Sequence, residues 1–139
     1  MRTIEWNDNL SVGVQLIDEQ HKMLIERLND VSQALEVKQG EREIIKTLSF
    51  LIEYTDFHFS AEEKHMAENN YPGLDEQKIQ HQEFITMLKT LEGDFEEEGS
   101  TPALADAINT FLLNWLTSHI QGLDKKFGDF LAEKGVVIA

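Results

Sequence analysis

The stretch HFSAEEKH, residues 58–65, places two imidazoles and a carboxylate on one face of a predicted helix. Glu62 follows His58 by four residues and precedes His65 by three, and side chains at these separations are neighbours on a helix surface. Glu62 and His65 also form the Glu-x-x-His pair that carboxylate-bridged two-metal sites in helix bundles use. A carboxylate between two imidazoles can bridge two metal ions. This stretch therefore predicts a helix that carries part of a metal site.

Four segments of the chain repeat apolar residues at intervals of three and four, which is the period of amphipathic helices. These segments are residues 17–38, 41–68, 74–95 and 102–119. The turn-forming run NNYPG, residues 69–73, separates the second from the third, and Thr101 followed by Pro102 is typical of a helix start. Gly122 should then loosen the chain before a short C-terminal helix at residues 124–134. Short connections favour antiparallel neighbours, so the sequence predicts an all-α, up-down-up-down four-helix bundle.

The residues before the first helix are predicted to form an extended arm of a single domain that spans residues 1–139. Residues 1–14 mix polar and β-branched side chains, and we expect Trp6 and Val12 to pack against the bundle. Asp18 is expected at the N-cap or in the first turn of the first helix.

The composition excludes several classes of function. The 26 acidic and 12 basic residues give a net charge of −14, which argues against binding to nucleic acids or to anionic membranes. The chain has no cysteine, so it forms no disulfide, thiolate nucleophile or iron–sulfur site. No apolar run resembles a signal peptide or a membrane span. We therefore expect a soluble, cytoplasmic protein.

All five histidines fall on predicted helices, and two carboxylates lie close to them in sequence. The complete set is His21, His58, Glu62, His65, His81, His119 and Asp124. Taken singly, each has an ordinary explanation as an exposed side chain, a surface charge or a helix cap. Burying five unpaired imidazoles together would be costly unless a metal binds them. Nitrogen and oxygen ligands without sulfur suit a pair of iron or manganese ions.

Several motifs along the whole chain are similar to those of one family, the bacterial hemerythrins. The matching stretches are WND (6–8), LSVGV (10–14), IDEQHK (17–22), HFSAEE (58–63), YPG (71–73) and WLTSHI (115–120), followed by Asp124. Hemerythrins are four-helix bundles that bind O2 reversibly at a non-haem di-iron centre. The resemblance therefore implies two iron ions with an oxo or hydroxo bridge, and O2 or a similar diatomic molecule as the ligand.

The resemblance also implies roles for individual residues. It assigns His21 and His58 to the iron that keeps an open position for O2, and Glu62 and Asp124 to the two bridging carboxylates. His81 and His119 correspond to two of three imidazoles on the other, saturated iron. The residues that correspond to the apolar lining of the O2 pocket are Leu24, Ile25, Phe59, Trp115 and Leu116. Such a lining excludes water and protons from the site.

One position departs from the family pattern. Relatives carry His-x-x-x-His on the third helix, whereas this chain has Gln77 in place of the first histidine, four residues before His81. Gln77 could coordinate weakly through its amide oxygen, or the second iron could be absent. The interpretation that we prefer here is that His65 replaces the missing ligand, because it stands where relatives carry an apolar residue. Gln77 would then lie beside the ligands or line the pocket.

The preserved ligands and apolar lining favour an O2-binding protein that is not an enzyme, used for storage, delivery or sensing of O2. The altered ligand set motivates one alternative, a di-iron oxidoreductase that acts as a peroxidase or oxidase or on nitric oxide. A second alternative is an iron- or redox-sensing module with an unidentified redox or signalling partner.

Overall fold

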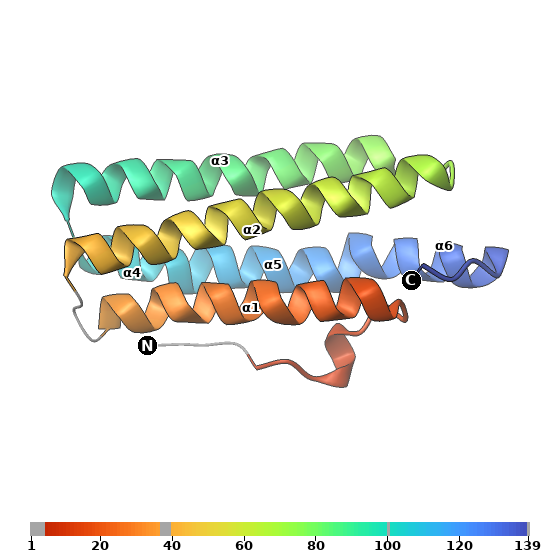
Figure 1. Ribbon diagram of the computed structural model, residues 1–139, viewed down its shortest axis with the longest axis horizontal. Helices are drawn as coiled ribbons and strands as arrows, with labels where there is room; N and C mark the ends of the chain where they lie inside the picture. Colours follow the sequence, from red (N-terminus) through yellow and green to blue (C-terminus); the bar gives the residue numbers. More distant parts are fainter. Residues whose placement is uncertain (1–4, 37–39, 100, 139) are drawn as a thin grey trace.

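The computed structural model describes residues 5–36, 40–99 and 101–138, and within these ranges it contains helices and no strand. Figure 1 shows three long helices and a fourth, segmented rod that run back and forth along one axis. The three helices are α1 (Gln15–Glu36), α2 (Glu41–Glu68) and α3 (Leu74–Glu98). The predicted all-α bundle is therefore confirmed, and α2 has the predicted bounds. No helix in the described ranges combines the length and the apolarity that crossing a membrane requires.

The fourth rod consists of five consecutive segments that follow one another without an intervening loop (Figure 1). They are α4 (Pro102–Asp106), the π-helical η2 (Ala107–Leu112), α5 (Leu113–His119), the π-helical η3 (Ile120–Asp124) and α6 (Lys125–Lys134). The Thr101 hydroxyl accepts a hydrogen bond from the Leu104 amide, and Pro102 occupies the first turn, as the sequence predicts. The predicted loosening at Gly122 is wrong, because the chain widens into a π-helix there and continues into α6.

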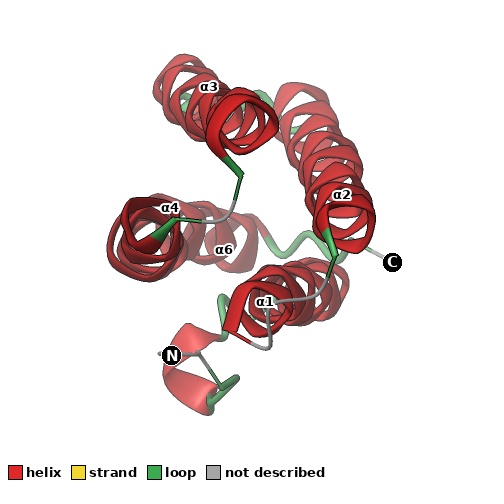
Figure 2. Cartoon of the chain, turned by 90° about the vertical axis from the view of Figure 1, so that its left-hand side faces the viewer, coloured by secondary structure: helices red, strands yellow, loops and turns green. Residues whose placement is uncertain are grey.

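The end-on view in Figure 2 shows the four rods arranged side by side in a bundle, and their buried apolar side chains form one shared core. α1 packs against α2, α2 packs against α3, and α4 contacts both α1 and α3. Each rod contributes fully or almost fully buried side chains, among them Leu28, Leu48, Phe84 and Leu112. The apolar stripes that define the four helices therefore face one another. Any polar side chain on those stripes is carried into the interior.

The N-terminal arm contacts both α1 and α6. It includes a short 3₁₀ turn, η1 (Asp8–Leu10), so it is not extended throughout as predicted. The Asp18 carboxylate, in the first turn of α1, accepts hydrogen bonds from the Val12 amide at 2.8 Å and from the Ser11 hydroxyl at 2.6 Å. Val12 is buried, and its carbonyl oxygen lies against Gly128 of α6, where a Cβ atom would overlap it. The arm thus closes the end of the bundle where α1 begins.

Replacing Gly128 with alanine should destabilise the protein by about 1–3 kcal/mol, because the added methyl group overlaps the Val12 carbonyl and displaces the arm. Urea denaturation monitored by circular dichroism measures the change. Gly93→Ala is the matched control, since nothing lies near its Cβ direction inside α3 and alanine favours helix. Equal stability of the Gly128→Ala variant and the parent would contradict the close contact.

Candidate metal centre

Six of the seven predicted ligands converge in the centre of the bundle. They form two groups, and the potential ligand atoms within each group all lie within 4.8 Å of one another. The first group is His21, His58, Glu62 and Asp124, and the second is Glu62, His81, His119 and Asp124. Each of these residues is at most 3% exposed. Glu62 and Asp124 belong to both groups, so two carboxylates lie between two pairs of imidazoles.

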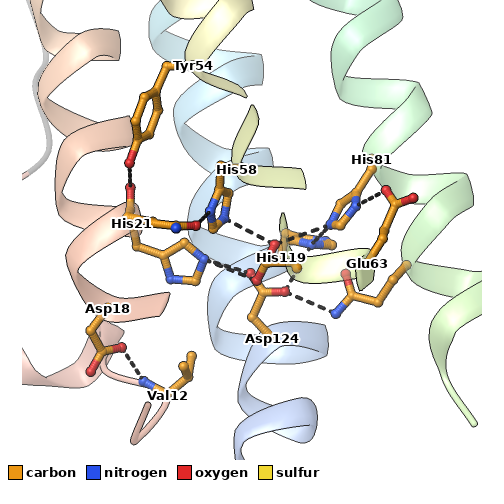
Figure 3. Close-up of polar contacts among 12 residues, drawn as sticks. Val12, Asp18, His21, Tyr54, His58, Glu63, His81, His119 and Asp124 are labelled. Carbon is orange, nitrogen blue, oxygen red and sulfur yellow. Dashed lines mark hydrogen bonds and ion pairs between the residues drawn. The ribbon is translucent and has the colours of Figure 1, made fainter. Parts of the chain in front are cut away.

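Each rod supplies a defined part of this cluster. His21 comes from α1, His58 and Glu62 come from α2, His81 comes from α3, and the fourth rod supplies the rest (Figure 3). His58 and Glu62 are one helical turn apart, which brings the His58 Nε2 atom within 3.1 Å of Glu62 Oε1. The sequence spacing therefore determines this pair directly.

The π-helical segment η3 brings the other carboxylate to the centre. Asp124 follows His119 by five residues, and in a regular α-helix two such side chains diverge by about 140°. A π-helix bonds residue i to residue i+5, so the two side chains face the same way. The His119 Nε2 atom then lies 3.3 Å from Asp124 Oδ1. The wide turn therefore brings the Asp124 carboxylate to the level of His119.

The two oxygens of each carboxylate serve different imidazoles. Asp124 Oδ2 lies 3.0 Å from His21 Nε2, whereas Oδ1 faces His119. Glu62 Oε2 lies 3.6 Å from His21 Nε2, and Oε1 lies 3.6 Å from His81 Nε2. The Nε2 atoms of His81 and His119 are only 3.1 Å apart. Imidazole nitrogens and carboxylate oxygens from all four rods thus face one small volume.

Most of these atoms have no hydrogen-bond partner among the described residues. The unpartnered buried atoms include Nε2 of His21 and His58, both carboxylate oxygens of Glu62 and Oδ2 of Asp124. A buried polar atom without a partner costs about 1–3 kcal/mol. Cations bound between these atoms would satisfy all of them at once, so the donor set fits a pair of metal ions.

Polar side chains hold three of the imidazoles from behind. The Nδ1 atom of His58 lies 2.8 Å from Gln20 Oε1, and Nδ1 of His119 lies 2.9 Å from Gln80 Oε1. Because an amide oxygen only accepts, the ring proton is on Nδ1 and the lone pair of Nε2 faces the centre.

His81 is held in the same way, with its Nδ1 atom 2.9 Å from Glu63 Oε2 (Figure 3). None of the three supporting residues, Gln20, Glu63 and Gln80, was predicted as part of the site from the sequence. The signal was available, because each stands next to a ligand-type residue of its own helix and therefore at the same level of the bundle. Such partners fix the orientation of a ligand ring and raise its basicity.

The charges of the centre stabilise one another. Burial is the largest influence on His21 and lowers its pKa, but the close ionic contacts with the Asp124 and Glu62 carboxylates outweigh it and raise the pKa to about 10. Burial and the charge of Asp124 raise the pKa of Glu62, yet His58 and His21 hold it at about 2. Without metal, His21 therefore carries a proton at neutral pH while Glu62 is ionised.

The pKa values of Asp124 and His81, the other two shifted groups of the centre, respond to similar causes. Burial raises the pKa of Asp124, but the imidazoles of His119 and His21 hold it well below its ordinary range. Burial also lowers the pKa of His81, against the opposing charge of Glu62. His81 is therefore neutral at physiological pH and has a lone pair to offer.

The structure places His65 outside the centre. The buried stripe of α2 continues from Glu62 to Met66, which is fully buried, so His65 stands at the edge of that stripe. Its side chain is 24% exposed, and its Nδ1 atom lies 3.8 Å from the Glu68 carboxylate. This geometry contradicts the prediction that His65 replaces the missing ligand.

Gln77 occupies that level of the centre instead. Its side chain is 1% exposed, and its Nε2 atom donates a hydrogen bond to Asp124 Oδ1 at 3.0 Å. Gln77, and not His65, therefore lies beside the ligands at this level of the centre.

The expected apolar lining surrounds the centre. Leu24, Ile25, Phe59 and Leu116 are buried, and Trp115 is partly buried against the same core. The Phe59 ring stacks on His81 with centroids 3.8 Å apart, and Trp115 stacks on His119 at 4.6 Å. These rings keep the imidazoles in place and shield them from water.

In the metal-free protein, His21 and Glu62 together should stabilise the fold most between about pH 4.5 and 6.5. The folded pKa of His21 is above its ordinary value of 6.5, so its contribution is complete below pH 6.5 and is lost as the pH rises towards 10. The folded pKa of Glu62 is below 4.5, so its contribution is present above pH 4.5 and is lost as the pH falls towards 2. Thermal denaturation midpoints of chelator-treated protein measure both limbs. A His21→Gln variant should flatten the alkaline limb, and an unchanged limb would assign it to another group.

Comparison with known proteins agrees with the resemblance seen in the sequence. The model of the hemerythrin HHE cation binding domain matches residues 12–131. The chain is 30% identical to the bacteriohemerythrin of Stenotrophomonas maltophilia (strain R551-3) over 129 residues, which cover 93% of this chain and 82% of that protein. It is 31% identical to the myohemerythrin of Riftia pachyptila over 122 residues, 88% of each chain, and 27% identical to a Clostridium acetobutylicum bacteriohemerythrin over 130 residues. The chain therefore belongs to the hemerythrin family.

Proposed function

We propose that this protein binds O2 reversibly at a non-haem di-iron centre in the core of its bundle. The observation that carries the proposal is the sharing of Glu62 and Asp124 by two groups of donors. Carboxylates that project inward between facing helices are how bundles hold two metal ions side by side. Membership of the hemerythrin family supports iron as the metal and O2 as the ligand.

In this proposal, the first iron position is held by His21 and His58 and the second by His81 and His119, with Glu62 and Asp124 common to both. The two irons, when bound, would supply the reversible redox chemistry that O2 binding needs. The chain contributes the rest. Gln20, Gln80 and Glu63 orient the imidazoles through Nδ1 and leave Nε2 free.

The apolar residues around the centre define its selectivity in this proposal. Leu24, Ile25, Phe59, Trp115 and Leu116 admit a small neutral molecule and exclude water and protons. Storage, delivery and sensing of O2 are all compatible with such a site. We propose a binding protein rather than an enzyme, because these residues enclose the centre in the core and supply no acid, base or nucleophile for a substrate.

Admission of O2 to the anaerobically reduced, iron-loaded protein tests the function. We expect a visible absorption band that appears with O2 and disappears when O2 is removed, because the enclosed site should protect the irons from irreversible oxidation. The measurement is repeated over several cycles to determine recovery. Direct conversion to a stable ferric spectrum in the first cycle would overturn reversible binding and favour an oxidoreductase.

Removing a shared carboxylate should weaken both iron positions together. Glu62→Gln should lower the affinity for each iron by about tenfold to a hundredfold or more, since even partners outside the ligand set cost that much. Iron content per chain after dialysis against a graded chelator measures the loss. His65→Leu is the matched control on the same helix and should keep the parental iron content, because His65 lies outside the centre. Loss of only one iron in Glu62→Gln would contradict sharing.

A further inference from the structure

We propose that the side-chain oxygen of Gln77 is a ligand of the second metal position, and that it makes this position one that accepts manganese beside iron. The inference rests on the proposed metal centre and concerns its chemical selectivity. It starts from a buried amide that has only one of its two polar atoms satisfied.

The hydrogen bond to Asp124 determines which way the Gln77 amide faces. A carboxylate oxygen that is ionised can only accept, so the amide nitrogen must be the atom 3.0 Å from Asp124 Oδ1. The oxygen, Oε1, is then the atom turned away from that contact. It is buried and has no hydrogen-bond partner among the described residues. A buried carbonyl-type oxygen in this condition needs a donor or a cation.

The same hydrogen bond assigns the amide to one metal position. Asp124 Oδ2 faces His21, which belongs to the first position, whereas Oδ1 lies 3.3 Å from His119 Nε2. Gln77 bonds to Oδ1, so its amide lies on the side of the second position. Because both amide atoms are bonded to the same carbon, Oε1 also lies in this part of the centre.

The charges around the second position also call for a cation. Glu62 and Asp124 flank it, and Glu63 lies behind His81. In the part of the chain that the structure describes, no lysine or arginine forms an ion pair with any of these carboxylates. The Oε1 atom of Gln77 adds a further partial negative charge to the same volume.

With Gln77 included, the second position offers two imidazole nitrogens and three oxygens. The family pattern would supply three imidazoles there. Imidazole favours iron, zinc and copper, whereas carboxylate and carbonyl oxygens favour manganese and other hard ions. Exchange of one imidazole for an amide oxygen therefore moves the preference of this position towards Mn2+. The first position, with His21 and His58, keeps the family set.

Two surface grooves reach the second position. His81 lines a groove between α2 and α3 together with Glu63 and Lys78. His119 lines another together with Gln80 and Trp115. The two rings are themselves only 2% and 3% exposed, so the grooves end at the outer sides of the imidazoles that hold this position.

Anaerobic titration of the metal-free protein with Mn2+, followed by electron paramagnetic resonance of the unbound ion, tests ligation. The parent should bind two equivalents. Gln77→Leu should lower the affinity for one equivalent by at least about tenfold and leave the other unchanged. Gln82→Leu is the matched control, because Gln82 is an exposed glutamine of the same helix whose amide donates a hydrogen bond to Thr86. Unchanged binding of both equivalents by Gln77→Leu would overturn the proposal.

Gln77→Glu separates a ligand from a residue that only orients Asp124. Glutamate keeps an oxygen donor but has no N–H group for Asp124. If Gln77 is a ligand, this variant should bind the second equivalent at least as tightly as the parent. If it binds as weakly as Gln77→Leu, Gln77 acts only through Asp124 and the proposal fails.

Loading with an equimolar mixture of Fe2+ and Mn2+, followed by elemental analysis of the desalted protein, tests selectivity. Gln77→His should take up a smaller share of manganese than the parent, and Gln82→His should match the parent. An equal manganese share in Gln77→His and the parent would overturn the selectivity. If neither metal binds to the parent or to any variant, the metal centre itself is refuted. That outcome differs from equal metal binding by the parent and the Gln77 variants, which would refute only the role of Gln77.

Discussion

The convergence of two buried carboxylates and four imidazoles is the constraint on which the rest of the bundle depends. Glu62 and Asp124 hold charge in an interior that is otherwise largely apolar. Such charges persist only where opposite charges or metal ions surround them. All four rods must therefore present a nitrogen or an oxygen at the same height. The apolar layers on either side of that height are what keep the rods close enough to do so.

The fourth rod meets this requirement by a change of helical pitch. His119 and Asp124 both reach the centre, although a separation of five residues would put them on different faces of a regular α-helix. The wide turn of η3 resolves the conflict locally and lets α6 continue along the same axis. The N-terminal arm then packs on α6 through Val12 and is bonded to α1 through Asp18. Local backbone geometry at the metal centre and closure of the bundle end are therefore part of one continuous chain of contacts.

Much of this arrangement could be predicted from the sequence. The three-and-four spacing of apolar residues gave the helices, and the turn run at 69–73 and Thr101 gave their boundaries, because these signals are local. The spacing of His58 and Glu62 determines their contact for the same reason. Convergence of His21, His81 and His119 depended on packing, yet short connections made it predictable.

Three features could not be derived in this way. The spacing of His65 from Glu62 suits a ligand, but its position at the edge of the buried stripe depends on how α2 packs against its neighbours. The π-helical turn is a compromise between local hydrogen bonding and tertiary demand, and no residue type encodes it. The partners Gln20, Glu63 and Gln80 lie across helix interfaces, so their contacts depend on the relative rotation of two rods.

The π-helical turn has a consequence for how this chain can diverge. At positions 121 and 123 the presence of a residue matters more than its identity, since exposed Gln121 and partly exposed Leu123 serve mainly to fill the wide turn. Substitutions there are compatible with the site. Five residues in the π-helical turn advance the chain by about the same angle as four in a regular α-helix, so the turn absorbs one residue and leaves the face of α6 on which the arm rests unchanged. Ile120 and Asp124, the buried ends of the turn, are held by the core and by the centre, so only the residues between them can be exchanged freely.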